Sequence, residues 1–243
     1  MFRDGVVLVD PFSASILPHE EIVPSRVESL VRALSVSGVQ ETPITVLVDG
    51  QLPPRLIVAD GHHRCEAARR LAGLRGAPMA VAARFVDCGG ATIRPAHRVV
   101  RHGPDGWAAR CAAKLRARLS PGADPGTLAF CSRGSAVERY DCAGLSGVEQ
   151  MRLLNDLCDE SLDWTIEADE SRALEELRAG RAEAAILVPA LTIEDVLAAA
   201  TSGRLLPPRS TNFQPKPQEA SIRFVLTPVE AGHLNSYCNY HCF

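Results

Sequence analysis

The stretch Asp60-Gly61-His62-His63-Arg64 carries the residues of this sequence that are best suited to chemistry. It directly follows a short apolar run, which predicts a strand, and a helix rich in alanine, arginine and leucine is predicted to begin at His62 or His63. A helix that begins where a strand ends directs N–H groups and the positive end of its dipole at the turn. The turn therefore predicts an anion site, which would suit a phosphate group.

Each residue of this turn has a chemical reason to be there. Gly61 lets the backbone approach a phosphate closely, His62 and His63 add ring nitrogens, and Arg64 can hold phosphate oxygens in a bidentate manner. A carboxylate such as Asp60 is compatible with an anion site when a cation lies between them. Mg²⁺ fits, because one or two carboxylates plus phosphate oxygens are its usual ligands. A purely structural turn, with one capping aspartate and one solvated histidine, would not need two adjacent histidines and an arginine.

Two other segments carry polar groups whose purpose the sequence leaves open. Glu20 lies in a loop before a predicted helix, where its carboxylate would suit a general base or a helix cap. Residues 207–216, Pro-Pro-Arg-Ser-Thr-Asn-Phe-Gln-Pro-Lys, contain two cations and are restrained by prolines. That run predicts either a shaped loop that holds a carboxylate or phosphate, or a basic surface loop.

Composition excludes several classes of protein. The 243 residues are 46% hydrophobic and 23% charged, as in a globular chain with one large domain or two small ones. A net charge of −3 and 5% aromatic residues argue against nucleic-acid binding as the main activity. No apolar run approaches the roughly 20 residues that span a bilayer, and residues 1–12 lack the apolar core of a signal peptide. We expect a cytoplasmic protein with no membrane partner.

The cysteines do not form a recognisable site. They are scattered with no CxxC pair, which indicates reduced and mostly buried thiols: Cys65, Cys88, Cys111, Cys131, Cys142, Cys158, Cys238 and Cys242. The C-terminal tail, residues 231–243, also contains His233 and His241, but the spacing matches no standard zinc pattern. We interpret this tail as a frayed terminus.

Hydrophobic periodicity predicts a mixed α/β protein with two lobes. For the first lobe it predicts helices at 24–37 and 62–74 and strands at 6–9, 44–48, 56–59 and 79–86. For the rest it predicts helices at 107–119, 148–158, 171–179 and 192–200, and strands at 128–131, 164–168, 184–188 and 221–226. The expected division is a compact first α/β unit at 1–90, a second lobe at 91–230 and the tail at 231–243.

Several of these segments, in this order, resemble one family. Residues 17–20 (Leu-Pro-His-Glu), 42–44 (Thr-Pro-Ile) and 60–64 are similar to the ParB/sulfiredoxin-like nucleotide-binding fold. The similarity is greatest to its free-serine kinases, which are the archaeal ADP-dependent enzymes and the ATP-dependent enzyme of a siderophore pathway. Residues 184–188 and 203–211 resemble the C-terminal segment of those kinases, and the likeness is weakest in the middle of the chain.

The resemblance implies a fold, a reaction and a set of residues. The fold is α/β (α+β), a ParB/sulfiredoxin-like domain with a second, smaller α/β lobe and an active site in the cleft between them. A phosphoryl group passes from ATP or ADP, with Mg²⁺, to the hydroxyl of free L-serine or a serine-like metabolite. Glu20 is the general base and Asp60 the metal-binding carboxylate. The phosphate ligands that the resemblance implies are Gly61, His62, His63 and Arg64, and the substrate ligands that it implies are Ser210 and Thr211. From the residues themselves, Arg209 and Asn212 of the same loop and His97 and Arg98 are further candidates to bind the substrate, through a carboxylate or phosphate.

Departures from the family pattern leave the acceptor open. The archaeal kinases carry a basic pair after the threonine, whereas this chain has Asn212-Phe213, and no substrate-side aromatic residue is apparent near residues 93–98. A non-catalytic nucleotide or metabolite sensor on the same fold is one alternative. A ParB-like nucleotide switch associated with DNA is another, and it would need a helix-turn-helix domain after the nucleotide domain. A sulfiredoxin-like reductase would need a cysteine where His62 stands. The oligomeric state is not indicated.

Overall fold

The computed structural model describes residues 6–11, 16–50, 55–77, 79–123, 127–158, 161–214 and 224–225. The chain forms two compact units, which are described separately below. The first consists of residues 1–92, 199–208 and 215–243, and the second of residues 93–198 and 209–214. Within the described parts no helix is long and apolar enough to cross a membrane.

The first unit is built on a five-stranded mixed sheet in the order β1-β6-β4-β5-β2. Its elements are β1 (Val6–Val9), β2 (Ile16–Leu17), α1 (Pro24–Ser37), β4 (Ile44–Val48), β5 (Leu56–Asp60), α2 (His62–Arg75) and β6 (Val81–Asp87). A separate pair is formed by β3 (Val39–Gln40) and β14 (Phe224–Val225). The central strand β4 runs parallel to β6 and antiparallel to β5.

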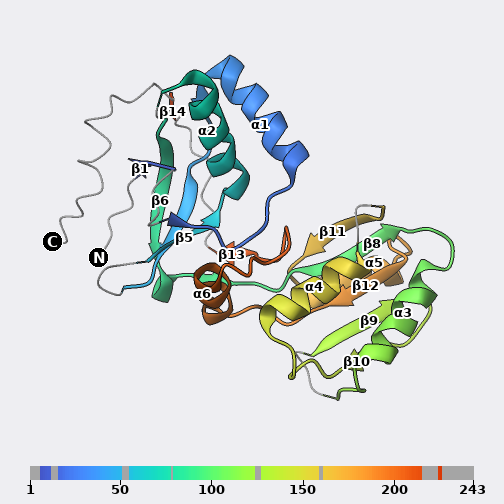
Figure 1. The fold of residues 1–243 in the computed structure, drawn as a ribbon. Helices are drawn as coiled ribbons and strands as arrows, with labels where there is room; N and C mark the ends of the chain where they lie inside the picture. The colour runs from blue at the N-terminus through green and yellow to red at the C-terminus, as the bar shows by residue number, and fades with distance from the viewer. Residues whose placement is uncertain are drawn as a thin grey trace. The chain divides into compact units, whose positions relative to one another are not determined.

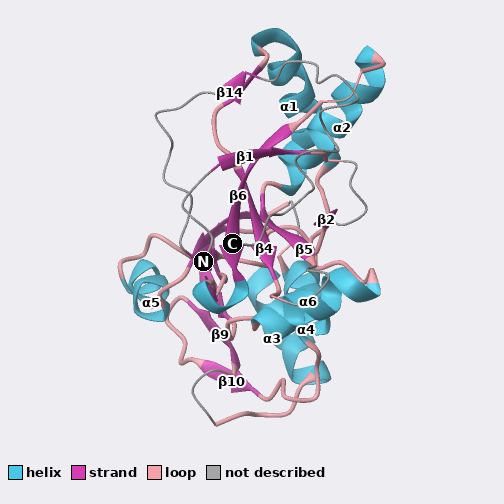
Figure 2. Ribbon diagram, turned by 90° about the vertical axis from the view of Figure 1, so that its left-hand side faces the viewer, coloured by secondary structure: helices cyan, strands magenta, loops and turns pink. Residues whose placement is uncertain are grey.

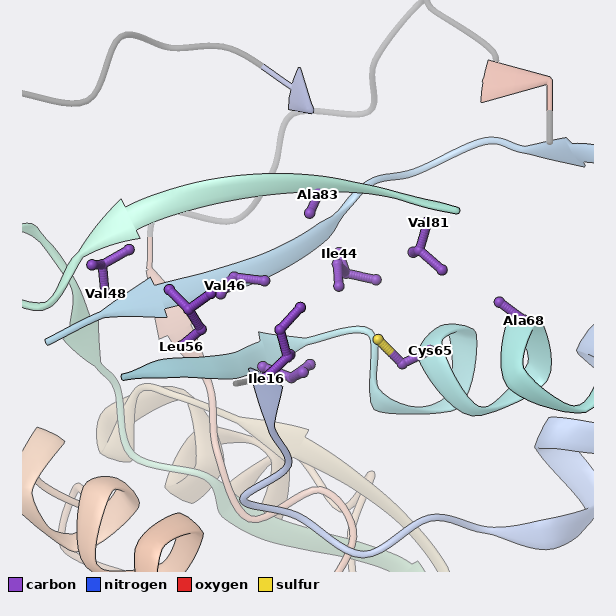
Figure 3. Close-up of a cluster of buried hydrophobic side chains, with 10 residues drawn as sticks. Ile16, Ile44, Val46, Val48, Leu56, Cys65, Ala68, Val81 and Ala83 are labelled. Carbon is purple, nitrogen blue, oxygen red and sulfur yellow. The ribbon is translucent and has the colours of Figure 1, made fainter. Parts of the chain in front are cut away.

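The two helices of the first unit form a layer on its sheet (Figure 1). One side of α2 packs on the strands through Cys65 and Ala68, which contact buried residues such as Ile44 and Val81 (Figure 3). The other side packs on α1, because Leu71 and its neighbours meet the buried side chains of that helix. The start of α2 is thus held firmly where the strand β5 ends.

The second unit also contains a five-stranded sheet, in the order β10-β9-β12-β8-β11. Its strands are β8 (His97–His102), β9 (Leu128–Ser132), β10 (Glu138–Tyr140), β11 (Asp163–Glu167) and β12 (Ala184–Leu187). Its helices are α3 (Trp107–Arg118), α4 (Gly147–Leu157) and α5 (Glu170–Arg178), and α6 (Ile193–Ser202) begins in this unit and ends in the first. The short segments β7 (Thr92–Ile93), η1 (Cys88–Gly90) and β13 (Phe213–Gln214) complete the described elements.

Helices cover both faces of this second sheet. Helix α5 lies on one face (Figure 2). It packs there through Ala173 and Leu177, which contact Val99 and other buried side chains. On the other side Trp107 of α3 lies edge-on to Phe130 of β9, and its indole N–H donates to the last carbonyl of α4, at Leu157. The alternation of side chains along each strand separates these two sets of contacts.

The mixed α/β architecture predicted from the sequence is confirmed, and most predicted elements lie within two residues of their observed bounds. Strand β8 was missed, although it lies between β11 and β12 in the second sheet. Its sequence, His-Arg-Val-Val-Arg-His, has only two apolar residues, so it lacks the pattern of a buried strand. Of the predicted strand at 221–226 only residues 224–225 are described, and the tail at 231–243 lies outside the described residues.

Candidate functional site

The turn from Asp60 to Gly61 connects β5 to α2 and has an unusual backbone. Between β4 and β5 the register shifts, so that Thr45 pairs with Asp60 but Val46 pairs with Val58, and Ala59 is an extra residue. Such bulges re-aim side chains at the end of a strand. Gly61 then adopts a φ of 98°, and a Cβ there would lie 2.6 Å from Cγ2 of the buried Ile44. Only glycine fits this position.

The carboxylate of Asp60 and the guanidinium of Arg64 form an ion pair across the first turn of α2. Nη2 of Arg64 lies 3.2 Å from Oδ2 of Asp60, and Nη1 donates to the backbone carbonyls of Thr42 and Pro43. Arg64 thus links three segments of the first unit and orients Asp60. The Asp60 side chain is 41% exposed, so its carboxylate is accessible to a ligand.

The carboxylate of Asp60 is the group at this turn that could bind a metal ion. The described residues contain no group of three histidine, cysteine, aspartate or glutamate side chains that would hold a metal by themselves. A single accessible carboxylate at a phosphate turn nevertheless suits Mg²⁺, which takes oxygen ligands and commonly completes them with phosphates and water. Asp60 therefore fits a magnesium ion that arrives with a nucleotide.

Two histidines from different segments meet beside the turn. The rings of His19 and His62 have centroids 4.5 Å apart at an interplanar angle of 72°, and both side chains are buried. Nδ1 of His19 lies 2.6 Å from the backbone carbonyl of Val58 and must donate to it, because a carbonyl only accepts. Burial lowers the pKa of His19 to about 4, and it also lowers the pKa of His62, with further lowering by His19, His63 and Arg64. Both rings are neutral at physiological pH.

Glu20 lies in the segment that these histidines contact. It forms an isolated parallel bridge with Leu206, a residue of the 199–208 stretch that belongs to the first unit. Glu20 and His62 line the same small pocket, about 160 Å³ in volume, together with Pro18, Ile22, Val58, Cys65, Glu66, Arg69 and Leu205. The structure therefore brings the predicted base beside the predicted phosphate turn.

In the second unit two arginines converge on one indole ring. The guanidinium carbon of Arg98 lies 4.3 Å, and that of Arg209 5.0 Å, from the ring centroid of Trp164. Strand register explains part of this arrangement. Arg98 pairs with Ile166 across β8 and β11, so Trp164, two residues away, is its diagonal neighbour on the same face. Two guanidinium groups beside one indole ring suit a carboxylate or phosphate.

The other predicted substrate residues lie in the same unit. Ser210 is buried, Thr211 and Asn212 are partly buried, and the backbone carbonyl of Asn212 accepts a hydrogen bond from the N–H of Arg94 at 2.9 Å. His97 is buried at the start of β8, where its Nδ1 accepts from the N–H of Val188 at 3.1 Å. Burial lowers the pKa of His97, although Glu170 and neighbouring carboxylates oppose this.

Sequence reasoning missed three contributors to these groups. Trp164 was expected only as part of a short strand, and His19 only as a neighbour of Glu20. Leu206 carries no chemical group that would draw attention, since it acts through its backbone. A usable signal existed for Trp164 alone, because the chain contains just two tryptophans and the family resemblance called for an aromatic residue on the substrate side.

At the level of sequence, the chain matches a known protein over a short stretch. No family model matches the chain. A curated relative, an ATP-dependent L-serine kinase from Staphylothermus marinus, is 43% identical over 56 residues. That match covers 23% of this chain and 22% of the relative, so the alignment spans about a fifth of either protein.

Solved structures match over most of the chain. A free serine kinase in complex with AMP has a TM-score of 0.63 at 17% identity and covers 86% of this chain and 87% of its own. A variant of free serine kinase in complex with ADP gives a TM-score of 0.64 at 16% identity, covering 87% of each chain. C-terminally truncated SbnI from Staphylococcus aureus gives 0.67 at 16% identity, covering 86% of this chain and 82% of its own. The chain therefore has the fold of the free serine kinases and SbnI, and the resemblance predicted from the sequence is confirmed.

Proposed function

We propose that this protein is a small-molecule kinase that transfers a phosphoryl group from ATP or ADP to the hydroxyl of free L-serine or a serine-like metabolite. The observation that carries the proposal is the pairing of two segments far apart in sequence. The stretch that holds Glu20 lies against the first turn of α2, which follows Asp60 and Gly61. A base close to a phosphate turn is what transfer to a hydroxyl requires. The named relatives, a serine kinase and nucleotide-bound free serine kinases, support the same reaction.

The proposed reaction is an in-line displacement at the terminal phosphorus of the nucleotide. The acceptor hydroxyl oxygen forms a new bond to phosphorus while the bridging P–O bond breaks, so that ATP leaves as ADP, or ADP as AMP. Glu20 accepts the hydroxyl proton. Because such transfers proceed through a loose transition state, the protein contributes mainly alignment and charge neutralisation.

The phosphate side of the site is assigned to the turn. Asp60 would hold Mg²⁺, which when bound neutralises charge on the phosphate oxygens. Gly61 allows the backbone to come close to a phosphate, and the first-turn N–H groups of α2, at His62, His63 and Arg64, suit its oxygens because no earlier turn accepts from them. The contacts of Arg64 with Asp60, Thr42 and Pro43 suggest that its main task is to orient the carboxylate.

The substrate side is assigned to the second unit. We propose that Arg98 and Arg209, held on Trp164, bind the carboxylate of the amino acid. Ser210, Thr211, Asn212 and His97 would complete this group, since they lie on the same loop or on the strand that contains Arg98.

The direct test is turnover of the purified protein with a defined set of donors and acceptors. ATP and ADP are each incubated with Mg²⁺ and L-serine, D-serine, L-threonine or L-homoserine, and the products are followed by ³¹P NMR. We expect phosphoserine or a close analogue, with stoichiometric ADP or AMP. No phosphorylated product with any donor and acceptor pair, together with measurable nucleotide binding, would contradict the kinase and favour the sensor.

The second unit is a sheet covered by helices, which gives no support to the DNA-associated alternative.

Two substitutions test the assigned carboxylates. Glu20→Gln and Asp60→Asn are expected to lower kcat by 10²-fold or more, because each removes a charge used in the transfer while preserving shape. Glu28→Gln, at an exposed position of α1, is the matched control and should keep wild-type turnover. Wild-type turnover of Glu20→Gln would contradict its assignment as the base.

A further inference from the structure

The segment that contains Glu20, residues 19–23, is held by hydrogen bonds donated by alternate backbone N–H groups. The N–H of His19 donates to Nε2 of His62 at 3.4 Å, and the N–H of Val23 donates to Nε2 of His63 at 2.9 Å. Between them the N–H of Glu21 donates to the carbonyl of Leu206 at 2.8 Å. The segment is therefore attached both to α2 and to residue 206, and Glu20 lies between the attached residues.

The same bonds define what the two histidine rings can do. A ring nitrogen that accepts a hydrogen bond carries no proton, so the proton of each neutral ring lies on Nδ1. The Nε2 atoms of His62 and His63 are thereby engaged with the protein backbone. A phosphate oxygen cannot take the place of these N–H groups at Nε2, because it is an acceptor facing an acceptor.

Local geometry explains why this attachment is needed. Val23 is the N-cap of α1, yet its side chain cannot cap a helix and no side-chain cap bond is present there. Residues 19–23 also follow a strand of only two residues, β2, which gives little support of its own. The segment is also held by hydrogen bonds with Leu206 and by that of the His19 ring with Val58.

We infer that His62 and His63 are positioning residues, which hold the Glu20 segment against the phosphate turn through Nε2. This inference rests on the proposed function, in which Glu20 is the base. The adjacent pair of histidines has a geometric reason, because residues 62 and 63 reach the two ends of one short segment. The pair thus couples the place where the donor phosphate binds to the place where the acceptor loses its proton.

The kinetic test uses His63, which is partly exposed, so that substitution there does not leave a cavity in the core. His63→Gln keeps an amide oxygen near the position of Nε2, whereas His63→Ala and His63→Asn cannot reach Val23. For Ala and Asn we expect kcat to fall by about 10- to 100-fold, since misplacing a reacting group by about 1 Å has effects of this order. For Gln we expect kcat within about 3-fold of wild type. In all three the nucleotide Kd from calorimetry should change less than about 3-fold.

Three kinetic outcomes would overturn the inference. The first is wild-type kcat in His63→Ala. The second is an equal loss in Gln and Ala, and the third is a selective loss of nucleotide affinity, which would make His63 a phosphate ligand. A double variant sharpens the assignment: if His63 acts through Glu20, then Glu20→Gln with His63→Ala should have the kcat of Glu20→Gln alone.

A second measurement separates this inference from the proposed function. Amide hydrogen exchange of peptides covering residues 19–23, measured without substrates, should be at least 10-fold faster in His63→Ala and His63→Asn than in wild type and His63→Gln. Unchanged exchange in all variants would overturn the positioning role even in an active kinase. Faster exchange in a protein whose Glu20→Gln variant retains full turnover would instead support the attachment and contradict Glu20 as the base.

Discussion

Arg98 donates a hydrogen bond from Nη2 to the backbone carbonyl of Arg209 at 2.8 Å, across 111 positions of sequence. The accepting residue, Arg209, has a φ of 62°, and among the described residues it is the one non-glycine residue with a positive φ. Residues that carry a side chain rarely adopt this backbone conformation, because it costs of order 1 kcal/mol or more. The buried side chain of Arg98 thus stabilises the strained backbone at Arg209. The guanidinium of Arg209 itself lies near the indole ring of Trp164.

The backbone and the charge of Arg209 can be separated by two substitutions. Arg209→Gly and Arg209→Ala both remove the guanidinium, and both should raise the KM for the amino acid by about 10-fold or more, because charge-assisted bonds to a carboxylate are lost. Glycine adopts a positive φ freely, so the free energy of unfolding in urea should be about 1 kcal/mol higher for Gly than for Ala. Equal stability of the two variants would argue that the turn is unstrained.

Gly61→Ala should be strongly destabilising. The new Cβ would meet Ile44 at 2.6 Å in a backbone conformation with φ of 98°, and neither atom can move away easily because Ile44 is fully buried. Strain and overpacking together predict a loss of about 2–4 kcal/mol, measured as the urea midpoint.

Gly73→Ala is the matched control for that substitution. Gly73 lies in the same helix, is exposed and has open space around its Cα. Alanine there should raise stability by about 0.5–1 kcal/mol, as expected in a helix interior. A Gly61→Ala variant as stable as wild type would contradict the observed turn geometry.

Stability should decline as the pH falls below 6.5. Burial holds the pKa of His19 at about 4 in the folded chain, so the unfolded chain takes up a proton first, near pH 6.5, and is favoured as the pH decreases. The contribution of His19 is complete above pH 6.5 and is lost towards pH 4. It amounts to about 2.5 kcal/mol between pH 7.5 and 4.5. His62, whose pKa is lowered by burial as well, adds in the same direction.

His19→Asn tests this pH dependence. Asparagine retains a donor near the position of Nδ1 for the carbonyl of Val58 but does not titrate. Urea unfolding of this variant should show a smaller loss of stability between pH 7.5 and 4.5 than wild type. An identical loss would exclude His19 as its source. His102→Gln, at an exposed position, controls for the removal of one imidazole.

Thiol reactivity should follow burial. Burial raises the pKa of Cys65 to about 11 and that of Cys111 to about 12, so little reactive thiolate exists at pH 7.5. Cys88 is partly exposed. Among the cysteines of the described residues, iodoacetamide labelling followed by peptide mass spectrometry should modify Cys88 first, and Cys65 and Cys111 only in denaturant. Rapid native labelling of Cys65 would indicate that the start of α2 opens readily.

The sequence by itself determined the structural features that form through contacts between residues close together in the chain. The strand, turn and helix around Asp60 and Gly61 lie within about 20 residues, and their apolar pattern and glycine specify that geometry directly. The same holds for α4, where Ser146 and Glu149 form a capping box. These features were predictable because their interactions close over a few residues.

Tertiary structure alone decided how the candidate site is assembled. The bonds of His62 and His63 with residues 19 and 23 span about 40 positions, and that of Arg98 with Arg209 spans 111. Leu206 and Val23 participate through backbone atoms that every residue possesses, so no residue type identifies them. Strand β8 is defined by its partners β11 and β12 rather than by its own composition. Such contacts arise when distant segments are packed together, and local periodicity carries no record of that pairing.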